Sequence, residues 1–159
     1  MSLEGAQAGL SWATVLAKRP RYCAVFANFE ADQVAQYGEA ELANIMADPG
    51  VIRNRGKIQS VITNARAIVA LEQKGESFSQ LLWSFAKTRY AKGAGMGADA
   101  PIPSQSPESA AMAQSLRRRG FRFVGATTCY SLMQAAGLVN DHAPDCFRWD
   151  EINRSAPTD

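Results

Sequence analysis

The sequence predicts an all-α protein of a single domain, and three observations support this prediction. Apolar residues recur at intervals of three and four over residues 57–71, which places them on one face of a helix. No segment alternates convincingly between polar and apolar residues, as a half-buried strand would. A chain of 159 residues, 47% of them hydrophobic, can form one continuous core, so one domain over residues 1–159 is expected.

The first predicted feature is a short turn between two helices near the start of the sequence. Gly9 can end one helix and Ser11 can cap the next, which leaves Leu10 between them as an exposed apolar tip. Such a tip can enter a base stack and help to expel a nucleotide from DNA. Glu4 and Trp12 would then offer a carboxylate and an aromatic plate to the expelled base. The plainer alternative makes Trp12 a core residue and Glu4 an exposed helical residue.

The middle of the chain is expected to be helical as far as one long loop. Helices are predicted over residues 38–46 and 57–71. Residues 92–107 are rich in glycine, proline and serine and have no periodicity, so we expect an exposed loop within the domain. Between the second of these helices and the loop, a break is expected at Gly75. A further helical stripe of apolar residues follows it, which consists of Phe78, Leu81, Leu82 and Phe85.

A helical hairpin is predicted over about residues 112–137. The helix that leads into it should start near Pro107, because Ser106 can cap a helix and proline suits the first turn. The second helix should cover about residues 126–136.

The turn of this hairpin combines glycine, aromatic and basic residues. Gly120 suits a left-handed helix end, and Gly125 permits close approach of another backbone. Phe121 and Phe123 are expected to anchor the turn in the core, while Arg122 and the N–H groups of the second helix face a phosphate. Such a hairpin can hold DNA without reading its sequence. The alternative is an ordinary helical hairpin with a basic edge.

The net charge of +2 is too small to indicate a nucleic-acid partner, so the positions of the basic residues matter more. For each basic cluster, a solvated surface without a partner is an open alternative. The three clusters are Lys18, Arg19 and Arg21; Arg53, Arg55 and Lys57; and Arg117, Arg118, Arg119 and Arg122.

Several classes of protein are disfavoured. No apolar run reaches the roughly 20 residues that span a bilayer, and the N-terminal residues lack the pattern of a secretory signal. Three widely spaced cysteines, Cys23, Cys129 and Cys146, argue against a disulfide framework and for a reducing compartment. We therefore expect a cytoplasmic protein with no membrane partner, and a monomer.

A weak metal half-site lies near the end of the chain. His142, the only histidine, precedes Cys146 by four residues, and both are good zinc ligands. A structural zinc takes four protein ligands, and neither Cys23 nor Cys129 stands in a paired spacing that would complete the set. The last residues, about 150–159, are expected to be a frayed tail.

Four segments lie in order between Leu3 and about Cys146: LEGAQAGLSWATVLAKR, VIRNRGKIQSVITNARAI, LLWSF and LRRRGFRFVGATTCYSLMQAAGLVNDH. Together they resemble the DNA-3-methyladenine glycosylase I family of the helix-hairpin-helix superfamily. The resemblance implies an all-helical helix-hairpin-helix fold. It also implies hydrolysis of the N-glycosidic bond of N3-methyladenine in alkylated double-stranded DNA, which leaves an abasic site.

The resemblance also implies roles for single residues. Glu4 would hydrogen-bond the excised base as the catalytic residue, and Trp12 would stack in its pocket. Gly9 and Leu10 would form the wedge. Two of the four ligands of a zinc ion would be His142 and Cys146.

The sequence departs from the family pattern at its start. A CxW motif and a YHDxEWG-like segment, which supply the other two zinc ligands and part of the base pocket, are absent from it. We therefore expect zinc to be missing or incomplete here, and Glu4 to lie near a fraying helix start. The main alternative function is a non-catalytic or inactive helix-hairpin-helix DNA-binding module. A second is a protein-interaction domain whose arginines bind an acidic partner.

A further carboxylate, Asp141, follows the hairpin. Glycoside cleavage passes through a state that resembles an oxocarbenium ion, and Asp141 could stabilise that charge or orient water. The alternative is that Asp141 makes a cap or a bond within the turn GLVNDH.

Overall fold

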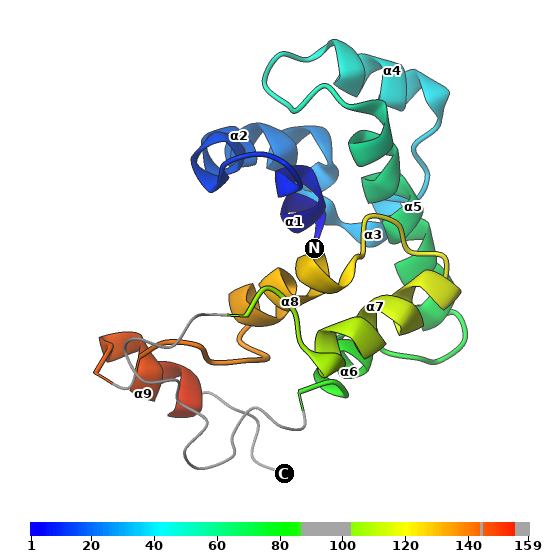
Figure 1. Ribbon diagram of the computed structural model, residues 1–159. Helices are drawn as coiled ribbons and strands as arrows, with labels where there is room; N and C mark the ends of the chain where they lie inside the picture. Colours follow the sequence, from blue (N-terminus) through cyan, green and yellow to red (C-terminus); the bar gives the residue numbers. More distant parts are fainter. Residues whose placement is uncertain (87–102, 144, 155–159) are drawn as a thin grey trace.

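The computed structural model describes residues 1–86, 103–143 and 145–154, and within these residues it is helical and contains no strand (Figure 1). Most of the predicted loop, residues 92–102, and the last five residues of the predicted tail lie outside the described part. No helix in the described part combines the length and the apolar character needed to cross a membrane. The helices are α1 (Ser2–Gln7), α2 (Trp12–Val25), the short 3-10 turn η1 (Ala27–Phe29), α3 (Ala31–Val34), α4 (Glu39–Ala47), α5 (Arg55–Glu72), α6 (Phe78–Trp83), α7 (Pro107–Arg118), α8 (Ala126–Ala135) and α9 (Phe147–Arg154).

The predicted helix starts are confirmed by their caps. The Ser11 hydroxyl accepts a hydrogen bond from the Thr14 N–H at 3.2 Å, and α2 begins directly after it. Ser106 accepts from the Ser109 N–H at 3.2 Å, with Pro107 in the first position of α7. These bonds satisfy N–H groups that have no partner within their own helix.

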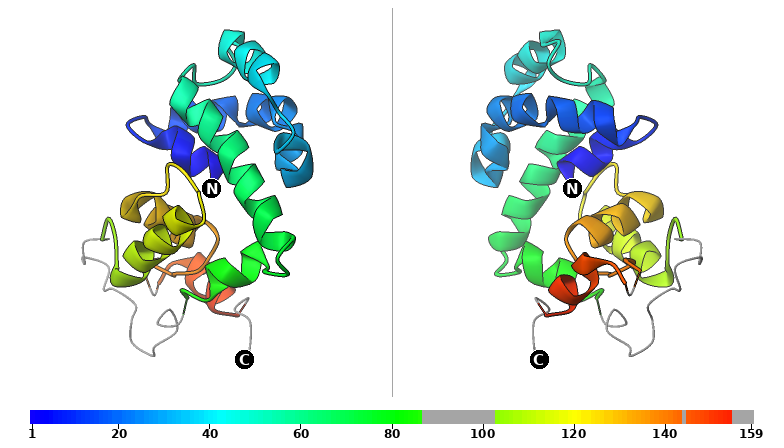
Figure 2. Two further views of the ribbon diagram at one scale, coloured as in Figure 1. Left: turned by 90° about the vertical axis from the view of Figure 1, so that its right-hand side faces the viewer. Right: turned by 90° about the vertical axis from the view of Figure 1, so that its left-hand side faces the viewer.

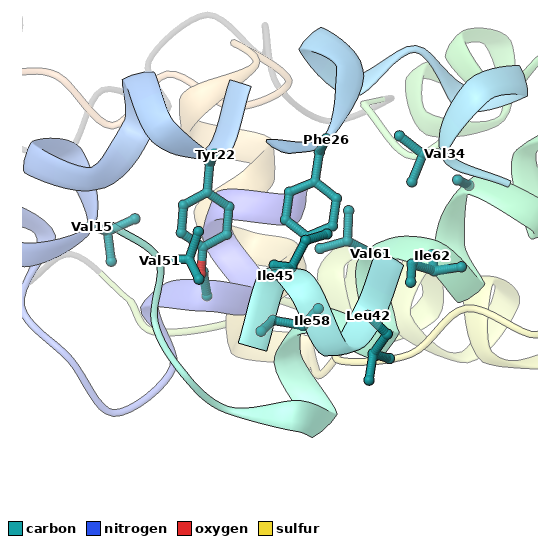
Figure 3. Packing of buried hydrophobic residues seen from close by; sticks show 12 residues of the cluster. Val15, Tyr22, Phe26, Val34, Leu42, Ile45, Val51, Ile58, Val61 and Ile62 are labelled. Atoms are coloured by element: carbon teal, nitrogen blue, oxygen red, sulfur yellow. The ribbon is translucent and has the colours of Figure 1, made fainter. Parts of the chain in front are cut away.

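The apolar core consists of two clusters joined by α5. In Figures 1 and 2, α5 runs from the group of α1–α4 to the group of α6–α8. Its first half contributes Ile58 and Ile62 to the first cluster, and its second half contributes Ala67 and Leu71 to the second. The first cluster also holds Val15, Tyr22, Phe26, Val34, Leu42 and Ile45 (Figure 3). The second holds Met112, Leu116, Phe121, Met133 and Leu138.

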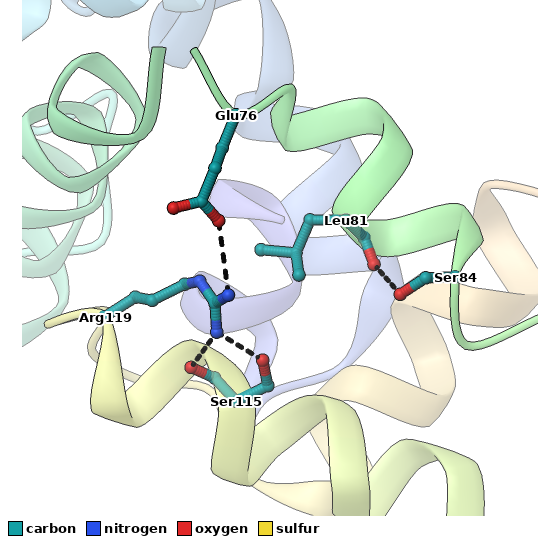
Figure 4. Close-up of polar contacts among 5 residues, drawn as sticks. All are labelled: Glu76, Leu81, Ser84, Ser115 and Arg119. Carbon is teal, nitrogen blue, oxygen red and sulfur yellow. Dashed lines mark hydrogen bonds and ion pairs between the residues drawn. The ribbon is translucent and has the colours of Figure 1, made fainter. Parts of the chain in front are cut away.

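A polar link ties the end of α7 to the turn that follows α5. The Arg119 guanidinium donates to the Ser115 hydroxyl at 2.7 Å and pairs with Glu76 at 3.2 Å (Figure 4). One member of the predicted basic cluster of the hairpin is therefore used inside the fold.

The predicted frayed tail is wrong for residues 150–154, which belong to α9. The side chain of the buried Asn140 donates to the Trp149 carbonyl at 3.1 Å and ties this helix to the segment after α8. The sequence prediction missed this support because it comes from a residue ten positions before the tail.

The turn η1 is left-handed and contains no glycine. Ala27, Asn28 and Phe29 have φ angles of 46°, 53° and 63°. This region of backbone space costs ordinary L-residues roughly 1–2 kcal/mol each, and asparagine adopts it most readily of the three. Stacking of Phe29 on the fully buried Phe26, with ring centroids 6.2 Å apart, helps to hold the turn.

Candidate active site

Glu4 and Trp12 line one hollow of about 690 Å³ between α1, α2, η1 and α8. Glu4 is 6% exposed and Trp12 is 38% exposed, so the alternative of a core Trp12 and an exposed Glu4 is wrong. Sequence reasoning did not assign the other residues around the hollow to this site, and those outside α2 come from segments that are distant from Glu4 along the chain. These residues include Arg19, Cys23, Asn28, Phe29, Leu132 and Ala135.

Glu4 lies in a buried helix and not in a frayed one, so that expectation is corrected. α1 is only six residues long but packs against α2, α5 and α8, and Gly5 and Ala6 are buried with Glu4. Within the described residues, the Oε2 atom of Glu4 is buried and accepts no hydrogen bond. Burial raises the pKa of the Glu4 carboxyl, and the positive charge of the Met1 amino group partly opposes this shift. A carboxylate oxygen without a partner is costly in a folded protein, which makes Oε2 of Glu4 a candidate binding atom.

The wedge turn, residues 7–11, has the predicted form. Gly9 has a φ of 76°, and Leu10 is 36% exposed. The Leu10 N–H donates to the Gln7 carbonyl at 2.7 Å, and the Gln7 amide donates to the Leu10 carbonyl at 2.7 Å. These two bonds close the turn and hold Leu10 outward.

Lys57 supports the wedge turn from α5 and is not part of a basic surface. It is buried, and its ammonium donates to the carbonyls of Ala6 and Ala8, at 2.9 and 2.6 Å. The sequence prediction placed it in a surface cluster because charge alone does not reveal a partner 49 residues away. A second member of that cluster, Arg55, pairs with Glu39 at 2.7 Å.

The basic cluster after the wedge turn is also partly committed to the fold. The Lys18 ammonium donates to the Pro49 carbonyl at 2.7 Å, and Arg21 pairs with Asp48. Arg19 is exposed and lines the hollow beside Glu4.

The hairpin turn, residues 119–125, joins α7 to α8 as predicted. Gly120 has a φ of 89° and ends α7, with the Phe121 N–H donating to the Leu116 carbonyl at 3.1 Å. Phe121 is buried and stacks on Phe78, with ring centroids 5.5 Å apart, which confirms it as the anchor. Arg122 is exposed, and its guanidinium makes no hydrogen bond or ion pair to the described residues.

The prediction that Phe123 anchors the turn in the core is wrong. Phe123 is 41% exposed, and its φ of 54° turns the chain back on itself. Its side chain lies beside Gly5 of α1 and Gly56 of α5, where an added Cβ would approach it to 3.4 and 3.6 Å. The hairpin turn is thereby in contact with the helix that bears Glu4.

Gly125 caps α8, yet nothing inside the described protein requires glycine there. Its φ is −71°, and an added Cβ would meet only the Arg117 guanidinium, at 3.8 Å. The close backbone approach that the sequence predicts at Gly125 is therefore not made by any described part of the protein.

His142 and Cys146 lie together but do not form a complete metal site. The Cys146 Sγ and His142 Nδ1 atoms are 3.5 Å apart. In the part of the chain that the structure describes, no group of three or more His, Cys, Asp or Glu side chains could hold a metal. These donors alone do not fit the four-ligand zinc site that the family resemblance implies.

Asp141 serves the end of α8 and does not line the hollow. Its carboxylate accepts hydrogen bonds from the Tyr130 hydroxyl and the Gln134 amide, both at 2.8 Å. Burial raises the pKa of Tyr130, and the bond to Asp141 raises it further. These bonds go to α8 and not within the turn GLVNDH, so the alternative of a bond within that turn is wrong.

Comparison with solved structures shows the class of protein to which this fold belongs. The chain superposes on a crystal structure of 3-methyladenine DNA glycosylase I with a TM-score of 0.85 and 49% identity, which covers 92% of this chain and 80% of that one. A second structure, a variant of the same enzyme type in complex with 3-methyladenine, gives a TM-score of 0.85 at 31% identity, over 92% of this chain and 78% of that one. The fold is that of the helix-hairpin-helix DNA glycosylases.

Sequence comparison then defines the family. Residues 1–149 match the family described as methyladenine glycosylase. DNA-3-methyladenine glycosylase 1 of Escherichia coli is 47% identical over 146 residues, which are 91% of this chain and 76% of that protein. DNA-3-methyladenine glycosylase of Haemophilus influenzae is 40% identical over 148 residues, covering 91% and 77%. The chain belongs to the methyladenine glycosylase family.

Proposed function

We propose that this protein is a base-excision repair enzyme that hydrolyses the N-glycosidic bond of N3-methyladenine in double-stranded DNA. It would act as a monomer in the cytoplasm. The observation that carries the proposal is the buried Oε2 atom of Glu4, which has no hydrogen-bond partner among the described residues and lines a hollow. The relatives bear the name of this activity, and one solved neighbour is a complex with 3-methyladenine.

Glu4 and Trp12 supply complementary contacts for such a base. A carboxylate oxygen accepts hydrogen bonds only, and the exocyclic amino group of a methylated adenine is a donor. Trp12 is exposed to the same hollow and offers an aromatic face for stacking. A positively charged base is also attracted to both groups, by charge and by the ring quadrupole.

The chemical step needs little acid catalysis. Methylation at N3 makes the base cationic, so when the N-glycosidic bond breaks the base leaves as a neutral molecule with the bonding electron pair. Water then adds to the sugar carbon and loses a proton, which leaves an abasic site. The protein would contribute extrusion of the nucleotide and its placement beside Glu4.

The hairpin turn and the wedge turn supply the DNA contacts in this proposal. The N–H groups at the start of α8, Gly125 and the exposed Arg122 are suited to a backbone phosphate. Leu10, exposed at the wedge turn, would fill the space that the extruded base vacates.

The direct test is release of methylated bases from duplex DNA treated with a methylating agent. The wild-type chain should release 3-methyladenine, and Glu4→Ala should lose most of that release while it still binds duplex. Asp141→Asn is a matched control, since it changes a carboxylate that does not line the hollow. Duplex binding without release by the wild type would favour the non-catalytic DNA-binding module. Release by Glu4→Ala at the wild-type rate would remove Glu4 from the site.

We further propose that this chain by itself does not retain a structural zinc. His142 and Cys146 offer one nitrogen and one sulfur donor, and binding must also deprotonate the thiol. Elemental analysis of protein purified without added metal should give far less than one zinc per chain, and Cys146 should react with a thiol reagent. Cys129, buried and with its pKa raised to about 11 by burial, should not react at neutral pH. Stoichiometric zinc would mean that other groups complete the site.

A further inference from the structure

Both turns of the proposed DNA-binding surface are held by buried polar residues on the same helix, α5. Lys57 donates to the carbonyls of Ala6 and Ala8 at the wedge turn, at 2.9 and 2.6 Å. At the hairpin turn the Asn64 side chain donates to the Arg122 carbonyl at 3.1 Å and accepts from the Arg122 N–H at 2.7 Å. Positions 57 and 64 are two helical turns apart, so the two side chains leave the same face of α5 about 10 Å from each other along its axis.

The wedge turn depends on Lys57 for its carbonyls. The last carbonyl groups of a helix have no partner within that helix, and α1 is too short to be stable alone. The Gln7 carbonyl is satisfied by the Leu10 N–H, and the Leu10 carbonyl by the Gln7 amide. The carbonyls on either side of Gln7 both receive their bonds from Lys57. An ammonium group also suits this position because the carboxyl end of a helix has a partial negative charge.

A buried lysine is uncommon and needs a reason. Lys57 does not line the hollow that holds Glu4, so it has no direct route to the base. Its two bonds lie between Glu4 in α1 and Leu10 in the wedge turn. Loss of these bonds would remove the polar link between α5 and this segment, and leave α1 held by its packing alone.

We propose that Lys57 is a positioning residue for base extrusion: it fixes the wedge turn and α1 to α5, and so sets their distance from the hairpin turn. This inference rests on the proposed function. If Lys57 has this role, the distance between the hairpin turn and Leu10 is fixed when DNA binds. The hollow beside Glu4 is then already in place to receive the extruded nucleotide.

Lys57→Met and Lys18→Met form the test pair. Both remove one positive charge and one lysine that donates to main-chain carbonyls, but Lys18 bonds to Pro49, away from the wedge turn. The probe is a duplex in which 2-aminopurine replaces the target base, because its fluorescence rises when it is unstacked. The measurement is made at saturating protein, so that extrusion is separated from binding. Affinity for an undamaged duplex and the melting temperature are recorded for each variant.

The two variants should differ in the fraction of the probe base that is extruded. Lys57→Met should lower the extruded fraction about ten-fold, because two carbonyls lose their partners and the wedge turn is no longer fixed. Lys18→Met should extrude as the wild type does. Affinity for undamaged duplex should change little and equally in both, because each ammonium is bonded to main-chain carbonyls within the fold and is not one of the proposed phosphate contacts. Equal extrusion by Lys57→Met and Lys18→Met would overturn the proposal.

Two further variants decide the question if Lys57→Met does not fold. Lys57→Arg keeps the charge and the donors, and Lys57→Gln is polar but shorter. Arginine should retain most of the extrusion and glutamine should not; equal extrusion by the two would contradict the proposal. A wild-type chain that extrudes the probe but releases no methyladenine would refute the proposed function only, and the Lys57 comparison would still decide this inference. A wild-type chain that extrudes nothing would contradict both.

Discussion

The wedge turn and the hairpin turn are both short connections between two helices, and each contains a glycine with a positive φ, 76° at Gly9 and 89° at Gly120. Each also exposes a large apolar side chain, Leu10 at 36% and Phe123 at 41%. They differ in what supports them. The hairpin turn has a buried anchor of its own in Phe121, whereas the wedge turn has no buried side chain and relies on bonds from Gln7 and Lys57.

This difference shows which kinds of support can be read from a sequence. An anchor such as Phe121 belongs to the local apolar pattern, and a glycine at a helix end is a local signal as well. Support by Lys57 depends on a contact across 49 residues and has no local signature. A turn such as the wedge turn can therefore be recognised from the sequence, but the contacts that make it rigid cannot.

The largest effect should come from removing the anchor of the hairpin turn. Phe121→Ala should lower the free energy of unfolding by about 3–5 kcal/mol, because a fully buried ring that stacks on Phe78 is lost. Leu10→Ala should change it by less than about 0.5 kcal/mol, as exposed positions do, and should instead impair base extrusion. Denaturant unfolding of the two variants measures this contrast. A large loss of stability in Leu10→Ala would mean that the wedge residue belongs to the core.

Substitution by alanine should affect stability at one glycine of the hairpin turn and DNA affinity at the other. Gly120→Ala should cost roughly 1–2 kcal/mol of stability, because alanine is strained at a φ of 89°. Gly125→Ala should cost less than about 1 kcal/mol, since its φ is −71° and the added methyl group has space. Gly125→Ala should instead lower the affinity for duplex DNA, because the new Cβ would stand in the way of the backbone phosphate that we propose binds there. Unchanged affinity in Gly125→Ala would place the phosphate elsewhere.

A smaller effect on stability is expected from the buried carboxyl group of Glu4 in α1. Because burial raises the pKa of Glu4, its ionised form destabilises the folded state at neutral pH, and this penalty disappears as the pH falls and the group is protonated. Glu4→Gln should therefore be more stable than the wild type at pH 7, because the amide has no charge to desolvate. The difference should shrink towards pH 4. Thermal melting of both proteins across this range checks the sign, and a gap that widens in acid would contradict it.

The sequence predicted several of the helices, the caps at Ser11 and Ser106 and the hairpin, because each depends on neighbours within a few positions. The segment motifs also brought Glu4, Trp12 and Leu10 together through the family resemblance. Asn28 and Phe29 were missed because the left-handed turn that presents them is held by packing on Phe26. The wrong position of Phe123 has a related cause. An alternating pair of phenylalanines does not reveal the positive φ that turns the second one outward.

Titration with free 3-methyladenine tests, without DNA or catalysis, whether the Oε2 atom of Glu4 receives the base. The wild-type protein should bind 3-methyladenine and quench the fluorescence of Trp12, which lines the same hollow. Glu4→Gln should bind about ten-fold more weakly or worse, because a charged acceptor is replaced by a neutral amide. Asp141→Asn should bind as the wild type does. Equal affinity in the wild type and Glu4→Gln would mean that the Glu4 carboxylate does not receive the base.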